Sequence, residues 1–515
     1  MSVGAATVLE VSSLPRSTPP DQGLSAVALE RFVAALDASD QEMHTVMVLR
    51  HGHVVLEREW APYRLADRHL LFSVSKSFTS MAIGLVVDAG LLSLDDQVIS
   101  FFSGDDLPGK ISDNLAALRV EHLLTMTTGH DKDTVDRLGR TGRMVQGFFA
   151  LEVEHPPGAP FVYNSGATYI LSAIVQKVTG EKLVDYLRPR LFEPLGATEA
   201  VWDSSDEGIT LGGWGLSLST ESLAHFGQFL LQRGEWQGRQ LVPAAWIDAA
   251  TAGQVDNSNQ DNPDWQQGYG YQFWRSRHNA YRGDGAFGQY CLILPEHDTA
   301  VILTSASPDM QATMDIIWQH LLPALQSTDA PGEAAPGAAV PGQAGLGAAV
   351  PGQAGLGADR TARDGGPGQR LGELRIPPPA GPAPAGGDGR RYRFARNHVG
   401  LTEVRLDEDG TGTFTFVRQT TLERSGGDPG PAQSGAQQVV FAPGDWQEHA
   451  YTLVDPAQRM VTSAYGDGDA FVATLRLLET PFALTFRCRP SGDRLVVDLT
   501  VNVAFGITND TFESL

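Results

Sequence analysis

The sequence predicts an α+β domain over residues 1–325, a tether over residues 326–388 and a small all-β domain over residues 389–515. Before the tether, apolar segments of strand type alternate with helical ones. After it, apolar residues alternate with others as they do in antiparallel strands. A chain of 515 residues is also longer than one hydrophobic core usually supports, so we expect at least two domains.

A β-hairpin is the first element that the pattern predicts. Residues 45–49 and 54–57 are short apolar segments that flank the turn His51-Gly52-His53. Two histidines at one turn supply too few ligands for a metal ion, so we predict no metal site there.

A buried helix is predicted to begin at Ser73. Its apolar residues recur at helical spacing, namely Phe78, Met81, Ala82, Leu85, Val86 and Ala89. Gly90 then ends the segment as a C-terminal cap. A second helical pattern covers residues 167–178, which places Tyr163 on a loop ahead of that helix.

Glycine, proline and alanine dominate the predicted tether. The decapeptide Gly-Ala-Ala-Val-Pro-Gly-Gln-Ala-Gly-Leu occurs at residues 337–346 and again at residues 347–356. Such a sequence buries too little apolar surface to offset the entropy of ordering it. We therefore expect a mobile segment over residues 326–388.

The C-terminal domain is predicted to be a small antiparallel barrel or sandwich. Apolar residues alternate over residues 482–488, a turn follows at residues 490–493, and alternation resumes over residues 497–505. Similar stretches occur at residues 412–417, 438–441 and 471–477. The domain contains no constellation of catalytic residue types.

Composition and charge exclude several kinds of partner. The net charge is -23, and the chain has only five lysines, so nucleic acid and anionic lipid are not expected to bind. The first residues lack the features of a secretory signal, and no apolar run approaches the ~18 residues that cross a bilayer. We expect a cytoplasmic protein without a membrane segment, in which Cys291 and Cys488 are buried reduced thiols.

The segment Ser73-Val74-Ser75-Lys76 carries the candidate chemistry. A spacing of three residues on a helix brings the Lys76 amine within reach of the Ser73 hydroxyl. Serine becomes a good nucleophile only when a neighbour takes its proton, and a buried lysine can do so in its neutral form. Tyr163, on its loop, could relay that proton between Lys76, Ser73 and a leaving group.

Several spaced motifs resemble those of the β-lactamase-like serine hydrolases, which include class C β-lactamases, D-alanyl-D-alanine peptidases, esterases of the same fold and 6-aminohexanoate-dimer hydrolases. These motifs are Phe72-Ser73-Val74-Ser75-Lys76-Ser77-Phe78, Leu123-Leu124-Thr125-Met126-Thr127-Thr128-Gly129-His130, the segment from Pro157-Gly158 to Ser165, and Gly212-Gly213-Trp214-Gly215-Leu216. The resemblance covers about residues 24–325. It implies an antiparallel sheet flanked by helices, with a mostly helical insertion.

The resemblance also implies roles for individual residues. Ser73 would be the acylated nucleophile, Lys76 its proton acceptor and Tyr163 the tyrosine of the second motif. That motif resembles Tyr-x-Asn but has Ser165 in the third position. A serine offers less hydrogen bonding to a substrate amide than asparagine does.

The third motif departs further from the family pattern. Where the lactamases have Lys-Thr-Gly, this chain has Arg282-Gly283-Asp284-Gly285-Ala286 and no lysine. This difference argues against recognition of a substrate carboxylate, unless Arg282 faces the cleft. The second oxyanion donor would be a backbone N–H of Ala286 or a neighbour, and Asp284 and Gly285 belong to the same substrate-binding stretch. The aromatic residues before the motif either shape the acyl pocket or belong to the core, and they are Trp265, Tyr269, Tyr271, Phe273 and Trp274.

We therefore expect a serine hydrolase that cleaves an ester or small amide through an acyl-enzyme on Ser73, without a metal or cofactor. Its partner would be a small-molecule substrate. Two alternatives stay open: a β-lactamase or D-alanyl-D-alanine peptidase, and a non-catalytic ligand-binding relative of the fold.

Overall fold

A computed structural model describes residues 13–138, 142–158, 160–326, 373–417, 435–454 and 456–515. The first residues of the chain, in which no secretory signal is expected, lie outside the described residues. So does most of the predicted tether, over residues 327–372.

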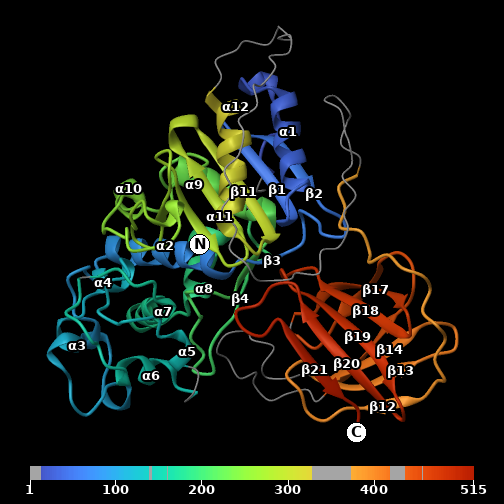
Figure 1. Cartoon of the computed structure of the whole chain (residues 1–515). Helices are drawn as coiled ribbons and strands as arrows, with labels where there is room; N and C mark the ends of the chain where they lie inside the picture. Colours follow the sequence, from blue (N-terminus) through green and yellow to red (C-terminus); the bar gives the residue numbers. More distant parts are fainter. Residues whose placement is uncertain (1–12, 139–141, 159, 327–372, 418–434, 455) are drawn as a thin grey trace, which may run out of the picture.

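A six-stranded antiparallel sheet forms the centre of the first domain (Figure 1). Its strands, in spatial order, are β2 (His53–Glu59), β1 (Glu42–Arg50), β11 (Thr299–Ala306), β10 (Gln289–Leu294), β9 (Tyr281–Gly285) and β8 (Trp274–Arg275). Strands β1 and β2 form the predicted hairpin around the His51-Gly52-His53 turn, which is confirmed. The sheet therefore joins the two ends of this domain's sequence.

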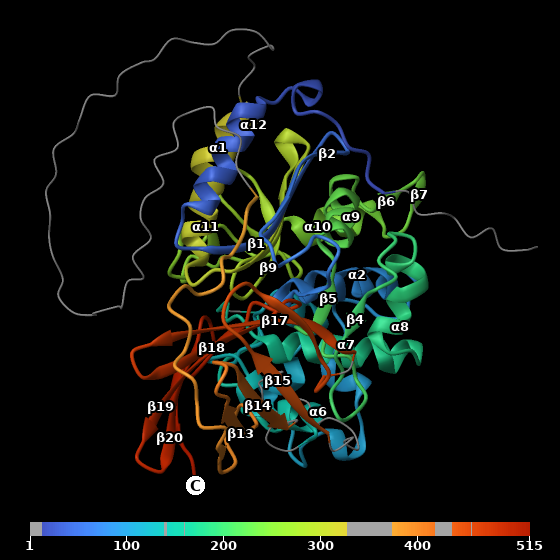
Figure 2. The same ribbon diagram turned by 90° about the vertical axis from the view of Figure 1, so that its right-hand side faces the viewer.

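Helices cover both faces of the sheet because its strands are apolar on both sides. In β1, Val46 and Val48 pack with one cluster of buried residues, whereas Met47 and Leu49 pack with the other. The first cluster includes residues of α1 (Ala26–Asp37) and α11 (Met310–Ile316), and the second includes residues of α2 (Ser75–Asp88) and α9 (Thr220–Leu231). Figure 2 shows α1, α11 and α12 (Leu322–Gln326) together on one side of the sheet.

A mostly helical insertion separates α2 from the later strands. Its helices are α3 (Asp113–Ala117), α4 (Val120–Leu124), α5 (Val135–Leu138), α6 (Met144–Ala150), α7 (Ser165–Thr179) and α8 (Leu183–Leu187). The helix α10 (Ala244–Thr251) and two small sheets complete the domain, the sheets being β3 (His69–Leu70), β5 (Leu216–Leu218) and β4 (Val201–Trp202), and β6 (Glu235–Trp236) with β7 (Arg239–Gln240). The expected sheet with flanking helices and helical insertion is confirmed.

The C-terminal region consists of two antiparallel sheets around one apolar core. The first contains β12 (Arg391–Arg393), β13 (Leu401–Leu406), β14 (Gly412–Val417) and β15 (Ala436–Phe441). The second contains β16 (Gln447–Tyr451), β17 (Gln458–Asp467), β18 (Ala470–Leu477), β19 (Ala483–Ser491), β20 (Arg494–Val501) and β21 (Asn509–Glu513). The expected hairpin is present as β19 and β20, but β20 ends at Val501, so Phe505 lies in a loop and not in a strand.

The last part of the predicted tether contacts both folded domains. Ala61 donates its N–H to Leu374 O at 3.0 Å, and Ile376 donates its N–H to Ala61 O at 2.8 Å. The Trp446 indole N–H then bonds to Ile376 O at 2.8 Å. Ile376 is 7% exposed, so this part of the predicted tether has one buried apolar side chain, and the mobility of the tether stays a prediction.

The two domains meet beside the small sheet that contains β3 (Figures 1 and 2). Arg476 of β18 makes two hydrogen bonds to the Glu42 carboxylate, at 2.6 and 3.0 Å. Leu70 donates its N–H to Glu479 O at 2.8 Å, so the second domain contacts the segment that leads into Ser73.

Two smaller expectations concern thiols and membranes. Cys291 and Cys488 are both buried and both free, as predicted. Over the ranges that the structure describes, no helix combines the length and the hydropathy of a membrane span.

Candidate active site

Ser73 lies at the start of the buried helix, in a short 3₁₀ turn, η2 (Phe72–Val74), that leads directly into α2. The helix therefore begins with a tighter turn than expected, while its end follows the prediction, since Gly90 adopts a left-handed conformation after Ala89. Phe72 has a φ of 47°, a conformation that costs a bulky residue about 1–3 kcal/mol. Ser73 itself is half-buried, so its hydroxyl is reachable from outside.

Lys76 directs its amine at the Ser73 hydroxyl. The distance from Lys76 Nζ to Ser73 Oγ is 3.0 Å, and the same amine donates to Ser165 Oγ at 3.1 Å and to Gly213 O at 2.8 Å. The side chain is 1% exposed. Burial lowers the pKa of Lys76 to about 8, although the carboxylates of Asp133 and Asp284 act in the opposite direction.

Tyr163 faces the same amine from the loop before α7. Its ring centroid lies 4.7 Å from Lys76 Nζ, and the ring stacks on Trp274 at 5.2 Å between centroids. Burial raises the pKa of Tyr163 well above its usual range, the Asp284 carboxylate adds to the rise, and hydrogen bonding with Ser73 opposes it. The phenol therefore keeps its proton over the pH range in which Lys76 loses one.

Ser165 and Asn164, both in the second motif, have different hydrogen-bond partners. Ser165 turns its hydroxyl to Lys76, as given above, whereas Asn164 caps α7 by accepting the Ala167 N–H at 3.2 Å. Asn164 also accepts a hydrogen bond from the Thr134 hydroxyl at 2.7 Å. Its carboxamide oxygen therefore acts as the N-terminal cap of α7.

The end of β9 packs directly against the backbone before Ser73. A Cβ atom on Gly285 would come within 2.1 Å of Leu71 O, so only glycine allows this approach. Ala286 and Phe287 follow in the turn to β10, and Phe287 has a φ of 64°. The structure thus brings Gly285 and Ala286 beside the helix start that carries Ser73.

Arg282 and Asp284 form a buried ion pair and not a cation facing the cleft. Arg282 Nε donates to Asp284 Oδ2 at 2.9 Å, and its Nη1 donates to Asp264 O at 2.9 Å and to the Ser276 hydroxyl. Arg282 is 0% exposed and Asp284 is 6% exposed. The guanidinium also stacks over Trp265, at 4.3 Å from the ring centroid. The condition under which Arg282 would replace the missing lysine, that it faces the cleft, is not met, because the side chain is buried and paired with Asp284.

The aromatic residues before the third motif belong mainly to the core. Trp274 and Tyr269 are 5% and 1% exposed, and both pack in a small cluster with Phe161 and Tyr163. Both rings pack against the ring of Tyr163.

The sequence did not indicate two contributors to the site. Gly213 belongs to one of the spaced motifs, but its carbonyl accepts a hydrogen bond from Lys76, which is 137 residues away in the sequence. The motif alone does not indicate this contact. Asp133 accepts the Ser165 N–H at 2.8 Å and raises the pKa of Lys76. Its only local signal is the Asp133-Thr134 pair ahead of the α5 segment, which is typical of a helix start.

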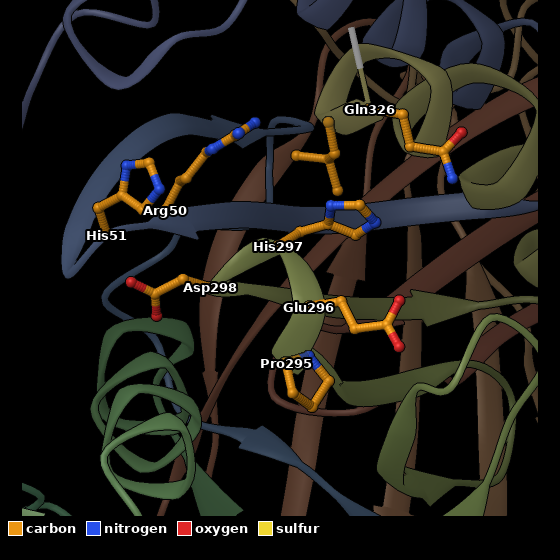
Figure 3. Close-up of a pocket in the computed structure, with 8 residues that line it drawn as sticks. Arg50, His51, Pro295, Glu296, His297, Asp298 and Gln326 are labelled. Atoms are coloured by element: carbon orange, nitrogen blue, oxygen red, sulfur yellow. The ribbon is translucent and has the colours of Figure 1, made fainter. Parts of the chain in front are cut away.

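A hollow of about 410 Å³ lies away from these groups (Figure 3). Its labelled side chains come from two neighbouring turns, with Arg50 and His51 on one and Glu296, His297 and Asp298 on the other. The first turn joins β1 to β2, and the second follows Leu294, at the end of β10 opposite Gln289, the residue that pairs with Gly285. In the parts of the chain that the structure covers, no three metal-ligating side chains gather into a cluster.

Comparisons with known proteins identify the family of the first domain. The sequence profile of the family described as Beta-lactamase matches residues 29–325, which is more than half of the chain. This chain belongs to the Beta-lactamase family. The β-lactamase fold spans the matched residues, and the antiparallel sheets of the C-terminal region follow it.

Relatives within and around this family are distant. A 6-aminohexanoate-dimer hydrolase from Paenarthrobacter ureafaciens is 26% identical over 331 residues, which span 59% of this chain and 83% of that protein. A lovastatin esterase from Penicillium rubens is 27% identical over 193 residues, spanning 32% of this chain and 48% of the esterase. A solved structure, described as a putative 6-aminohexanoate-dimer hydrolase from Bacillus anthracis, has a TM-score of 0.52 at 20% identity and covers 61% of this chain and 88% of its own. The last comparison shows a common fold.

Proposed function

We propose that this β-lactamase-family protein is a serine hydrolase that cleaves an ester or small amide through an acyl-enzyme on Ser73. The observation that carries the proposal is the 3.0 Å distance between Lys76 Nζ and Ser73 Oγ, at a lysine whose pKa burial lowers to about 8. A lysine at its ordinary pKa would hold its proton at neutral pH and could not accept one from serine.

In the acylation step, Ser73 Oγ attacks the substrate carbonyl carbon and its proton passes to the neutral Lys76 amine. The carbonyl oxygen becomes an oxyanion, for which the backbone N–H groups of Ser73 and of Ala286 or Gly285 are the proposed donors. The close packing of β9 on the Ser73 segment supports this assignment.

The leaving group then needs a proton, and Tyr163 is the proposed donor. Its raised pKa keeps the phenol protonated, and its position beside Lys76 lets the lysine ammonium replace the proton that the phenol gives away. Hydrolysis of the acyl-enzyme repeats the sequence with water as the nucleophile and Ser73 as the leaving group.

The buried ion pair favours an ester or a small neutral amide over a β-lactam or a cell-wall peptide. The last two carry a carboxylate, and Arg282, the cation of the third motif, is fully buried and paired with Asp284. A substrate carboxylate placed near Asp284 would be repelled. The names of the relatives, an amide hydrolase and an esterase, point to the same substrate classes.

Labelling by a fluorophosphonate probe, followed by peptide mass spectrometry, tests the proposal. We expect one adduct on Ser73, turnover of p-nitrophenyl acetate, and much slower turnover of nitrocefin. A Ser73→Ala variant should lose both the adduct and ester turnover. An adduct without turnover of any ester or amide would favour the non-catalytic relative, and efficient nitrocefin turnover would favour the β-lactamase.

A further inference from the structure

Four phenylalanine rings meet at the junction of the two domains, and we refer to them as the phenylalanine cluster. Phe72 and Phe287 come from the first domain, and Phe482 and Phe505 come from the second. Phe505 lies 5.7 Å from Phe72 and 4.9 Å from Phe287, measured between ring centroids. Phe482 lies 6.2 and 6.0 Å from the same two rings, which are themselves 5.5 Å apart.

The two rings of the first domain are chain neighbours of the reacting groups. Phe72 precedes Ser73, and Phe287 follows Ala286, one of the proposed oxyanion donors. Both residues have positive φ, which turns their side chains away from the regular path of the adjoining helix or strand. The phenylalanine cluster is therefore one residue along the chain from Ser73 and from Ala286.

The second domain is held firmly at this place. Besides the Leu70 N–H bond to Glu479 O, Arg68 pairs with the Glu479 carboxylate at 3.2 Å. Arg459 pairs with Asp67 in the same region. These contacts fix the position of Phe482 and of the loop between β20 and β21 relative to Ser73.

Phe505 differs from the other three rings in its exposure. It lies in the loop between β20 and β21 and is 65% exposed, and Ile507 in the same loop is 67% exposed. Phe72, by contrast, is 8% exposed. Phe505 and Ile507 thus form an exposed apolar surface on one loop, and Phe505 joins it to the rings of Phe72 and Phe287.

We propose that Phe505 is a specificity-determining residue whose open ring forms an apolar wall of the acyl site, so that the enzyme selects extended apolar acyl groups over short ones. The inference rests on the proposed function, because it describes the substrate of the same serine. The second domain thereby contributes to substrate selection although it supplies no group to the chemistry. Lys76 and Arg282 already have partners, so an apolar acyl chain would not displace a hydrogen-bonded charge.

A comparison of p-nitrophenyl acetate with p-nitrophenyl hexanoate tests this in the full-length protein. We expect the wild type to prefer the hexanoate, and Phe505→Ala to lower kcat/KM for the hexanoate at least about tenfold while changing the acetate value less than about twofold. Phe505→Leu should recover part of the preference. Val440→Ala, which alters another exposed apolar residue of the same domain, should leave the ratio of the two substrates unchanged.

The outcomes separate the two proposals. Turnover of both esters with an unchanged ratio in Phe505→Ala would overturn the inference and leave the proposed function standing. An equal loss on both substrates, together with a lower melting temperature, would show a purely structural role and would also overturn it. Absence of turnover and of a Ser73 adduct in the wild type would overturn the proposed function itself.

Discussion

Two buried cations lie near the candidate nucleophile, and their surroundings differ in one respect. The direct partners of Lys76 are two hydroxyls and a backbone carbonyl, all of them neutral. The direct partners of Arg282 include the carboxylate of Asp284. Burial without an ion pair makes a lysine release its proton, whereas burial with an ion pair holds a charge in place. The difference supports the proposal that Lys76 acts as the base and that Arg282 has a structural role.

The largest expected effect is the loss of the base. Lys76→Met keeps a side chain of similar length and should lower kcat/KM for an ester by about 10²–10⁴-fold, because Ser73 then has no proton acceptor. Lys177→Met is the matched control, since Lys177 is half-exposed and paired with Asp106 on the surface. Steady-state kinetics measure both variants, with thermal unfolding to verify that they are folded. Equal activity in Lys76→Met and in the control would remove Lys76 from the mechanism.

Breaking the other buried cation should act on stability. Arg282→Met leaves the Asp284 carboxylate buried without its partner, and we expect it to lower the free energy of unfolding by about 3–5 kcal/mol. The double variant Arg282→Met with Asp284→Leu should recover most of that loss, because the unpaired charge is gone. Urea unfolding of the three proteins measures this. If Arg282→Met alone were as stable as the wild type, the ion pair would not stabilise the fold.

The smallest expected effect concerns the orientation of Lys76. Ser165→Ala removes one neutral hydrogen bond to the amine, which is worth about 1 kcal/mol, so kcat should fall about five- to tenfold. Ser172→Ala is a matched control on the same helix, because Ser172 bonds to Thr210 O and not to Lys76. A fall in kcat of similar size in both variants would show that the effect comes from the helix and not from the amine.

The comparison also shows what the sequence could predict about the site. The Ser73 and Lys76 pairing follows from local helix geometry, which a spacing of three residues is enough to define. The surroundings of Lys76 do not, because Ser165 and Gly213 lie 89 and 137 residues away and meet it only in the folded domain. The sequence did not indicate that Arg282 packs on Trp265, because this contact also forms only in the folded domain.

The fold shows a similar limit. Alternating apolar residues predicted β14 and the hairpin of β19 and β20. This signal is local, because successive residues of a strand face opposite sides of the sheet. The same alternation continues to Phe505, although the strand ends at Val501, because pairing with β21 and contact with the first domain decide where it stops. Ile376 likewise accepts a hydrogen bond from Trp446, a contact that its neighbours in the sequence do not indicate.

The pH dependence of kcat/KM for an ester tests the central claim most directly, because it reports the ionisation of the free enzyme's base. Lys76 accepts a proton only when neutral, and its lowered pKa makes the neutral fraction grow as the pH rises through about 8. We predict that kcat/KM increases about tenfold per pH unit below that value and levels off above it. The high pKa of Tyr163 leaves the phenol protonated on that plateau. A profile that is flat or falling between about pH 6.5 and pH 9.5 would contradict the account of a neutral lysine base.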